Sequence, residues 1–225
     1  MQTGPTGEHR TRVSPTTVIR LAWAAVGVVI LALPAAAAPS PHEIIDRVAA
    51  ASASVPNMTA DVVFKVWRRK PTGNQSADCE YTGTMVVQGG HPAVKVARGG
   101  TSVVCSAINH YAVGKLFDAS EPLAAFLDRF DFTVAGDKQV GADAYYRLEG
   151  PARDPKGNPH AMSAWIDYNN GLITQGTLNY DWGTVDVQQQ YAQMNNVSVL
   201  ARQNVQSSKF AAVLEVDYSN FHISP

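Results

Sequence analysis

Apolar and polar residues alternate with a period of two along most of this 225-residue chain, and this pattern limits the fold more than any other feature. In the segment 58–70, Val62, Phe64 and Val66 fall on one side, whereas Asp61 and Lys65 fall on the other. Successive side chains of a β-strand point to opposite faces, so such a segment buries one face and exposes the other. The pattern therefore predicts short strands with one apolar face.

Turn-forming residues separate these segments. Gly89-Gly90 and Gly99-Gly100 divide three segments early in the chain, and Asn169-Asn170-Gly171 and Asp181-Trp182-Gly183 divide three later ones. Tight hairpin turns need residues that accept positive φ, which glycine and asparagine do most readily. We count about ten short strands and predict that they form an antiparallel meander.

A helix is expected at the start of the region that follows residue 38. Ser40 can cap it, Pro41 suits its first position, and Glu43 stands at the spacing of a capping box. Ile44 and Val48 begin an apolar stripe at helical spacing. Pro56-Asn57 should end this helix.

A second helix is expected over 120–130, with Ser120 as its cap. Leu123, Phe126, Leu127 and Phe130 recur at the spacing of one helical face. Many strands with two separate helices indicate an α+β fold, in which the helices lie on one face of a single curved antiparallel sheet.

Residues 1–38 have the three parts of a secretory signal peptide. Arginines dominate the charge of the first 20 residues, 21–38 are uncharged, and the segment ends in alanines. The folded domain is then expected over 39–225, outside the cytoplasm. A retained membrane anchor is the alternative, because 18 uncharged residues reach the lower limit for a span of about 17–25 residues.

Charge and motifs exclude several classes of function. Without the leader the chain has a net charge of −3 and no basic stripe, so we expect no nucleic-acid partner. The sequence has no G-x-S-x-G elbow, no glycine-rich phosphate loop and no H-E-x-x-H motif. We therefore expect a protein that is not an enzyme and that uses no cofactor.

Cys79 and Cys105 are the two cysteines. In an exported protein an even number of cysteines favours a disulfide, and this one would close a loop of about 25 residues. Two buried thiols are the alternative. A metal site is not expected, because two thiols and scattered histidines do not provide the ligand spacing of known sites.

The short strands carry more apolar residues than one ordinary buried face of a sheet would need. They could form a solid core under the two helices, or line an apolar cavity that the helices cover loosely, and composition does not separate the two because both are lined by the same residue types. The candidates for a cavity are Val62, Phe64, Val66, Met85, Val87, Val94, Val96, Leu123, Phe126, Leu127, Tyr146, Leu148, Met162 and Ile166.

The order of these segments over 41–224 resembles the LolA-like family of periplasmic lipoprotein carriers, which includes the sigma-factor regulator RseB and several mycobacterial lipid-binding lipoproteins. The resemblance rests on the opening helix before a long first strand and on the segments 131–150, 165–183 and 209–223. It implies a half-open β-barrel whose helices cover an apolar concave face.

The resemblance implies a monomeric periplasmic carrier that binds acyl chains of lipids or lipoproteins, with a membrane receptor as a further candidate partner for hand-over. An RseB-like domain that senses envelope proteins without a transport role is the alternative. The carriers have an Arg-Pro pair, tied to lid control, at the turn before the third strand. Here that stretch is Gly90-His91-Pro92, so the hand-over function of the arginine is not carried over.

Overall fold

The first helix of the domain is the one that the capping pattern predicts. The computed structural model describes residues 38–68, 72–73, 75–98, 122–209 and 212–224, without the side chains of 96–98. Helix α1 (Pro41–Ala53) begins at Ser40, whose hydroxyl accepts from the backbone N–H of Glu43, while the Glu43 carboxylate accepts from the backbone N–H of Ser40. Ile44 and Val48 are its buried residues, as predicted.

In the part of the chain that the structure describes, ten strands make one antiparallel sheet, which confirms the predicted class and the approximate number of strands. They are β1 (Met58–Trp67), β2 (Cys79–Gln88), β3 (His91–Arg98), β4 (Thr133–Val140), β5 (Asp143–Pro151), β6 (Ala161–Asp167), β7 (Leu172–Tyr180), β8 (Gly183–Met194), β9 (Val197–Ser207) and β10 (Val213–Ile223). The short helix α4 (Leu123–Leu127) precedes β4.

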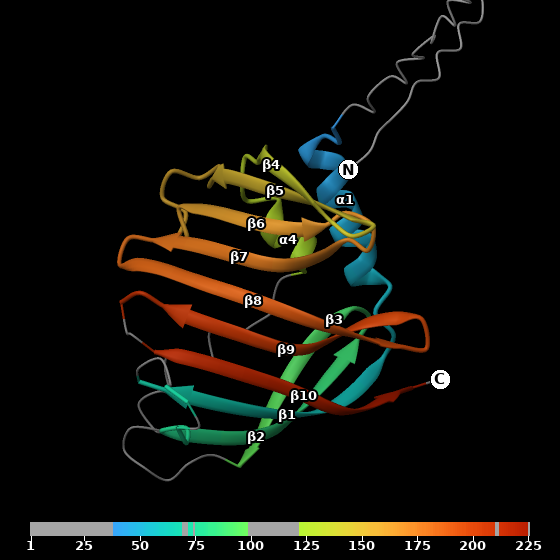
Figure 1. Cartoon of the computed structure of the whole chain (residues 1–225), viewed down its shortest axis with the longest axis vertical. Coiled ribbons are helices and arrows are strands. Elements are labelled where there is room, and N and C mark those ends of the chain that lie inside the picture. Colours follow the sequence, from blue (N-terminus) through green and yellow to red (C-terminus); the bar gives the residue numbers. More distant parts are fainter. Residues whose placement is uncertain (1–37, 69–71, 74, 99–121, 210–211, 225) are drawn as a thin grey trace, which may run out of the picture. The chain divides into compact units, whose positions relative to one another are not determined.

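The sheet has the order β3-β2-β1-β10-β9-β8-β7-β6-β5-β4 (Figure 1). All neighbours are consecutive in the chain except β1 and β10, which pair from Met58 with Ile223 to Trp67 with Val213. That pairing joins the two ends of the domain. The sheet is curved and does not close, since β3 and β4 each have a single neighbour among the described strands.

Three turns have the predicted residues. Gly89 and Gly90 join β2 to β3 with φ of 59° and 78°, and Gly171 and Gly183 also have positive φ, at 66° and 139°. The predicted strand over 101–113 and the turn at Gly99-Gly100 lie outside the described residues.

Two predictions need correction. Strand β9 was not predicted: Asn195 and Asn196, with φ of 48° and 65°, form a turn that sends the chain back along β8. Helix α4 is shorter than the predicted 120–130, and its N-cap is Pro122, which forms no side-chain cap. Phe130 bridges to Ala152 instead of continuing the helix, because the chain there already pairs with the end of β5.

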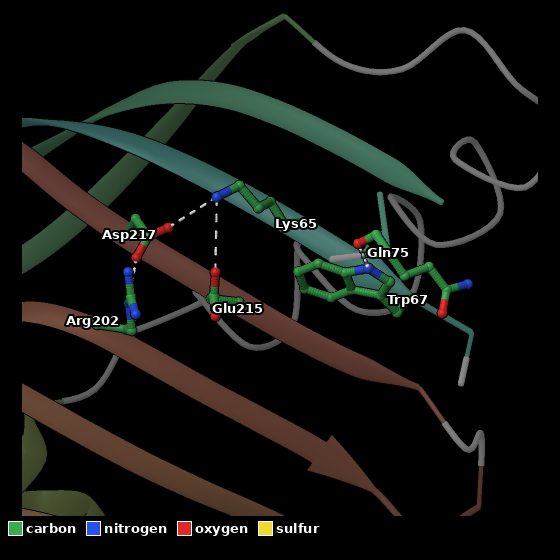
Figure 2. Close-up of polar contacts among 6 residues, drawn as sticks. All are labelled: Lys65, Trp67, Gln75, Arg202, Glu215 and Asp217. Carbon is green, nitrogen blue, oxygen red and sulfur yellow. Dashed lines mark hydrogen bonds and ion pairs between the residues drawn. The ribbon is translucent and has the colours of Figure 1, made fainter. Parts of the chain in front are cut away.

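The outer face of the sheet at β1, β9 and β10 has a group of ion pairs (Figure 2). The Nζ atom of Lys65 lies 3.3 Å from a carboxylate oxygen of Asp217 and 3.8 Å from one of Glu215. The Nε atom of Arg202 donates to the other oxygen of Asp217 at 2.6 Å. This hydrogen bond raises the pKa of Arg202. Because side chains alternate along a strand, the residues between these charged ones point to the opposite face, which is apolar.

Candidate apolar binding face

Directly paired residues form an unbroken apolar row across nine of the ten strands. Partners in neighbouring antiparallel strands point to the same face, so the register alone places these side chains together. From β2 to β4 the row is Cys79, Val66, Leu214, Val205, Val187, Gly176, Ala164, Leu148 and Val134. Each of them is buried or half-buried. One face of the sheet is therefore apolar across almost its whole width.

The buried side chains on this sheet fall into two clusters. The first, which we call the strand cluster, contains buried residues of β1, β2 and β8–β10. The second, the helix cluster, joins Ile44 and Val48 of α1 and Leu127 of α4 to residues of β5 and β6. Leu178 of β7 packs against both. The apolar face is thus continuous, but its two parts have different neighbours.

The predicted cavity residues divide between these clusters. Val62, Phe64, Val66, Met85 and Val87 are buried in the strand cluster, and Val94 packs against it. The helix cluster includes Leu127, Leu148, Met162 and Ile166, with Leu123, Phe126 and Tyr146 packed against it. Val96 lies in β3, and its side chain is not among those described.

Helix α1 is packed closely on the turn between β6 and β7. The guanidinium carbon of Arg47 lies 4.0 Å from the centre of the Tyr168 ring, which makes an edge contact with Tyr146. A Cβ atom at Gly171 would overlap the backbone carbonyl of Arg47. The helix and the turn therefore approach more closely than a side chain at position 171 would allow.

Helix α4 is fixed to the end of β5 by Arg153. The guanidinium donates to Asp128 at 3.0 Å and to Asp131 at 2.9 Å, and the Arg153 backbone N–H donates to the carbonyl of Arg129 at 2.7 Å. The two aspartates that bracket Arg129 thus serve a structural contact. Both described helices contact the β5–β7 end of the sheet, and neither contributes a residue to the strand cluster.

Polar side chains interrupt the apolar face at β8 and β9, which sequence reasoning missed. Gln189 and Gln203 are direct partners, two residues beyond the pair Val187 and Val205. Both are half-buried. The hydroxyl of Tyr191 lies 2.9 Å from Gln189 and 3.0 Å from the carbonyl oxygen of Ile173. The alternation within 185–191 was the signal that could have identified Gln189, since it places this residue on the face of Val185 and Val187.

Two hollows formed by described residues lie away from the apolar row. One of about 300 Å³ is near the start of β1 and includes Asn57, Gly89 and Ser224. The other, of about 350 Å³, lies beside α4 and includes Arg129 and Pro159. Their linings contain no member of the row, so neither hollow is a candidate for a site on it.

Other expected features stand as follows. Among the described side chains no three His, Cys, Asp or Glu residues gather as metal ligands would. No described helix combines the length and the apolar character needed to cross a bilayer. Cys79 is buried at the start of β2, and Cys105 lies outside the described residues, so the disulfide stays a prediction, as do the leader 1–38 and the domain limits 39–225. His91 begins β3 beside the turn and is exposed.

The fold is similar to that of solved LolA-type structures. A LolA superfamily protein from Nitrosomonas europaea is 12% identical, with a TM-score of 0.51 over 84% of this chain and 95% of that one. A domain from Vibrio parahaemolyticus, described as that of an outer membrane lipoprotein-sorting protein, is 10% identical, with a TM-score of 0.53 over 81% and 92%.

A DUF1329 family protein from Desulfovibrio piger has 12% identity and a TM-score of 0.51, over 81% of this chain and 92% of its own. No protein-family model matches the chain, and no curated protein matches it. These structures thus share the fold with this chain at very low identity, and the expected fold-level resemblance is confirmed.

Proposed function

We propose that this chain is an extracytoplasmic carrier that binds the acyl chains of lipids or lipoproteins against the apolar face of its sheet. The observation on which the proposal depends is the apolar row across nine strands, of which the two described helices cover only the β5–β7 end. Most members of the row are already buried, and the half-buried Val187, Gly176 and Val134 are the ones with surface left for contact with a flexible hydrocarbon chain.

The energetics favour such a ligand. Burying one methylene group is worth about 0.8 kcal/mol, so an acyl chain that covers several residues of the row is held firmly. Val187 and Leu178 are half-buried near the middle of the sheet, so each has apolar surface left to cover. No charged partner is needed for this binding mode, in keeping with the chain's small net charge.

The similar structures and the leader support the same proposal. One of the three similar structures is described by its role in outer membrane lipoprotein sorting. Cleavage of residues 1–38 would place the domain outside the cytoplasm, where such ligands are exchanged between membranes. We propose a lipid or a lipid-modified protein as the partner, and no catalytic step.

The helix contacts indicate where a ligand would enter. Lifting α1 would separate Arg47 from the Tyr168 ring, and lifting α4 would break the hydrogen bonds of Arg153. We expect entry over β8 instead, where Val187 is half-buried and these helices supply no side chain to the strand cluster.

A matched pair of substitutions tests the proposal. Val187→Asn places an amide in the apolar row, and Val63→Asn places the same amide at a half-buried valine on the other face of β1. We expect the first to weaken binding of a fluorescent acyl probe about tenfold, because an amide buried against hydrocarbon loses its water. The second should leave the affinity within about twofold. Equal affinities for both variants and the wild type would contradict the proposal.

A further inference from the structure

Four uncharged polar side chains gather on the apolar face where the pairing of β9 with β10 ends. Gln203 is the direct partner of Gln189 on one side and of Val216 on the other. Tyr218 follows Val216 by two residues and so points to the same face, on the diagonal from Gln203. Tyr191 contacts Gln189. Apolar pairs flank this group, which includes neither a lysine nor an acid.

The hydrogen bonds of Tyr191 and Gln189 leave at least one donor of this group unused. A tyrosine hydroxyl has one proton to donate, but that of Tyr191 lies within 3.0 Å of two groups, the carbonyl of Ile173 and the amide of Gln189. If it donates to the carbonyl, Gln189 presents only its Oε1 to the hydroxyl, and both N–H groups of the amide remain. If it donates to Gln189, both N–H groups of that amide remain. Gln189 therefore keeps a donor in either arrangement.

Gln203 and Tyr218 add further donors. Neither side chain makes a hydrogen bond to another of the described residues, and Tyr218 is 7% exposed. Burial raises the pKa of Tyr218 and of Tyr191, so both hydroxyls stay protonated at neutral pH. No buried side-chain nitrogen or oxygen among the described residues lacks a hydrogen-bond partner, so the free donors of Gln203 and Tyr218 reach solvent. A ligand that accepts a hydrogen bond can therefore replace water at these donors.

We infer that Gln189, Gln203 and Tyr218 form a neutral subsite for the carbonyl group of an ester- or amide-linked acyl chain, on the face that the hydrocarbon itself occupies. This inference rests on the proposed function. The subsite has donors but no positive charge, so it suits a neutral acceptor better than a carboxylate or a phosphate, which bind most strongly to charged donors. The carrier would therefore distinguish acylated lipids from plain hydrocarbon.

A pair of soluble lipids that differ only in the carbonyl tests the inference. Dioctanoylglycerol has two ester carbonyls, and its diether analogue dioctylglycerol has none. A hydrogen bond contributes about 0.5–1.5 kcal/mol net, so we expect the full-length protein to bind the ester about tenfold more tightly than the ether in a competition assay. An N-octanoyl amide of the same chain length, compared with the ester in the same assay, shows whether the subsite prefers an ester or an amide carbonyl.

Substitutions assign the preference to these residues. Gln203→Met and Tyr218→Phe each remove a donor while they keep most of the apolar volume, so they should lower the ester preference to about threefold or less and leave ether binding intact. Gln190→Met, at an exposed residue paired with Arg202, is the control and should keep the full preference.

The outcomes separate the two proposals. If the wild type binds neither lipid nor any acyl probe, the proposed function fails. If it binds ester and ether equally, and neither variant changes this, the carrier function stands and the subsite is contradicted. A preference that persists in both variants also contradicts the assignment to these residues.

Discussion

Gly171 shows how one residue controls the position of a helix. It has a φ of 66°, and a Cβ there would overlap the backbone of Arg47 in α1. We expect Gly171→Ala to destabilise the fold by about 2–4 kcal/mol, since it combines left-handed backbone strain with a backbone clash. Urea unfolding of wild type and variant measures this loss.

Gly141→Ala is the control for the strain alone. Gly141 has a nearly equal φ of 62°, but a Cβ there meets nothing within 4 Å. Its variant should lose only about 1 kcal/mol. Equal losses for the two variants would mean that the approach of α1 to the β6–β7 turn is not tight.

Single residues were predictable where their role is local. The sequence indicates Ser40 and Glu43 as caps and Gly171 as a turn residue, because each acts within a few positions along the chain. The partner of a residue across the sheet depends on register instead. The pairing of Gln189 with Gln203 arises from the register of β8 with β9, so it could not be predicted without β9.

At the scale of elements, α1 makes a prediction about pH. The backbone N–H of Ser40 donates to Glu43 at 2.6 Å, and this hydrogen bond lowers the pKa of that carboxyl below its ordinary value of 4.5. The unfolded chain therefore binds more protons near this pH. The stabilisation by Glu43 should be present above pH 4.5 and disappear as the pH falls through the lowered pKa.

Glu43→Gln removes the titrating group and tests this prediction. The difference in unfolding free energy between wild type and variant should shrink as the pH falls from about 6 to about 3. His42→Gln is the control: this exposed neighbour lowers the pKa of Glu43 less than the Ser40 hydrogen bonds do, so the variant should keep most of the acid dependence. A difference that stays constant over this range would show that the capping box does not stabilise the domain.

The ends of helices and strands were predicted best where capping, proline or turn residues mark them. Helix α1 has a cap, a proline and an apolar stripe, and its start was predicted correctly. Helix α4 was predicted from an apolar stripe and a cap at Ser120, which lies outside the described residues, and the pairing of Phe130 with Ala152 ends the helix early. Strand β9 has a weaker alternation, and the Asn195-Asn196 turn was its one clear signal.

For the whole molecule, the class of fold was predictable and the closing contact was not. Alternation and turns give an antiparallel meander, but the pairing of β1 with β10 joins segments about 150 residues apart, and no local pattern encodes it. The division of the apolar face into two clusters follows from which strands the helices reach. Composition alone therefore left both the core and the cavity open, with the ordinary core as the preferred interpretation.

The predicted Cys79–Cys105 bridge acts on the whole domain. It would close a loop of about 25 residues and contribute about 3 kcal/mol. A thiol reductant should then lower the midpoint of thermal unfolding by several degrees. The Cys79→Ala/Cys105→Ala double variant should show a lower midpoint that no longer responds to the reductant. A wild-type midpoint unchanged by reduction would contradict the bridge.

The central claim is that a hydrocarbon ligand completes the apolar face of the sheet. Native mass spectrometry of the full chain after gentle extraction tests it most directly, because it weighs whatever remains bound. We expect an added mass that matches an acylated lipid or lipoprotein in the wild type and is reduced in Val187→Asn. A bound protein without lipid would support the sensor alternative instead, and wild-type protein that appears only at its own mass would contradict the carrier.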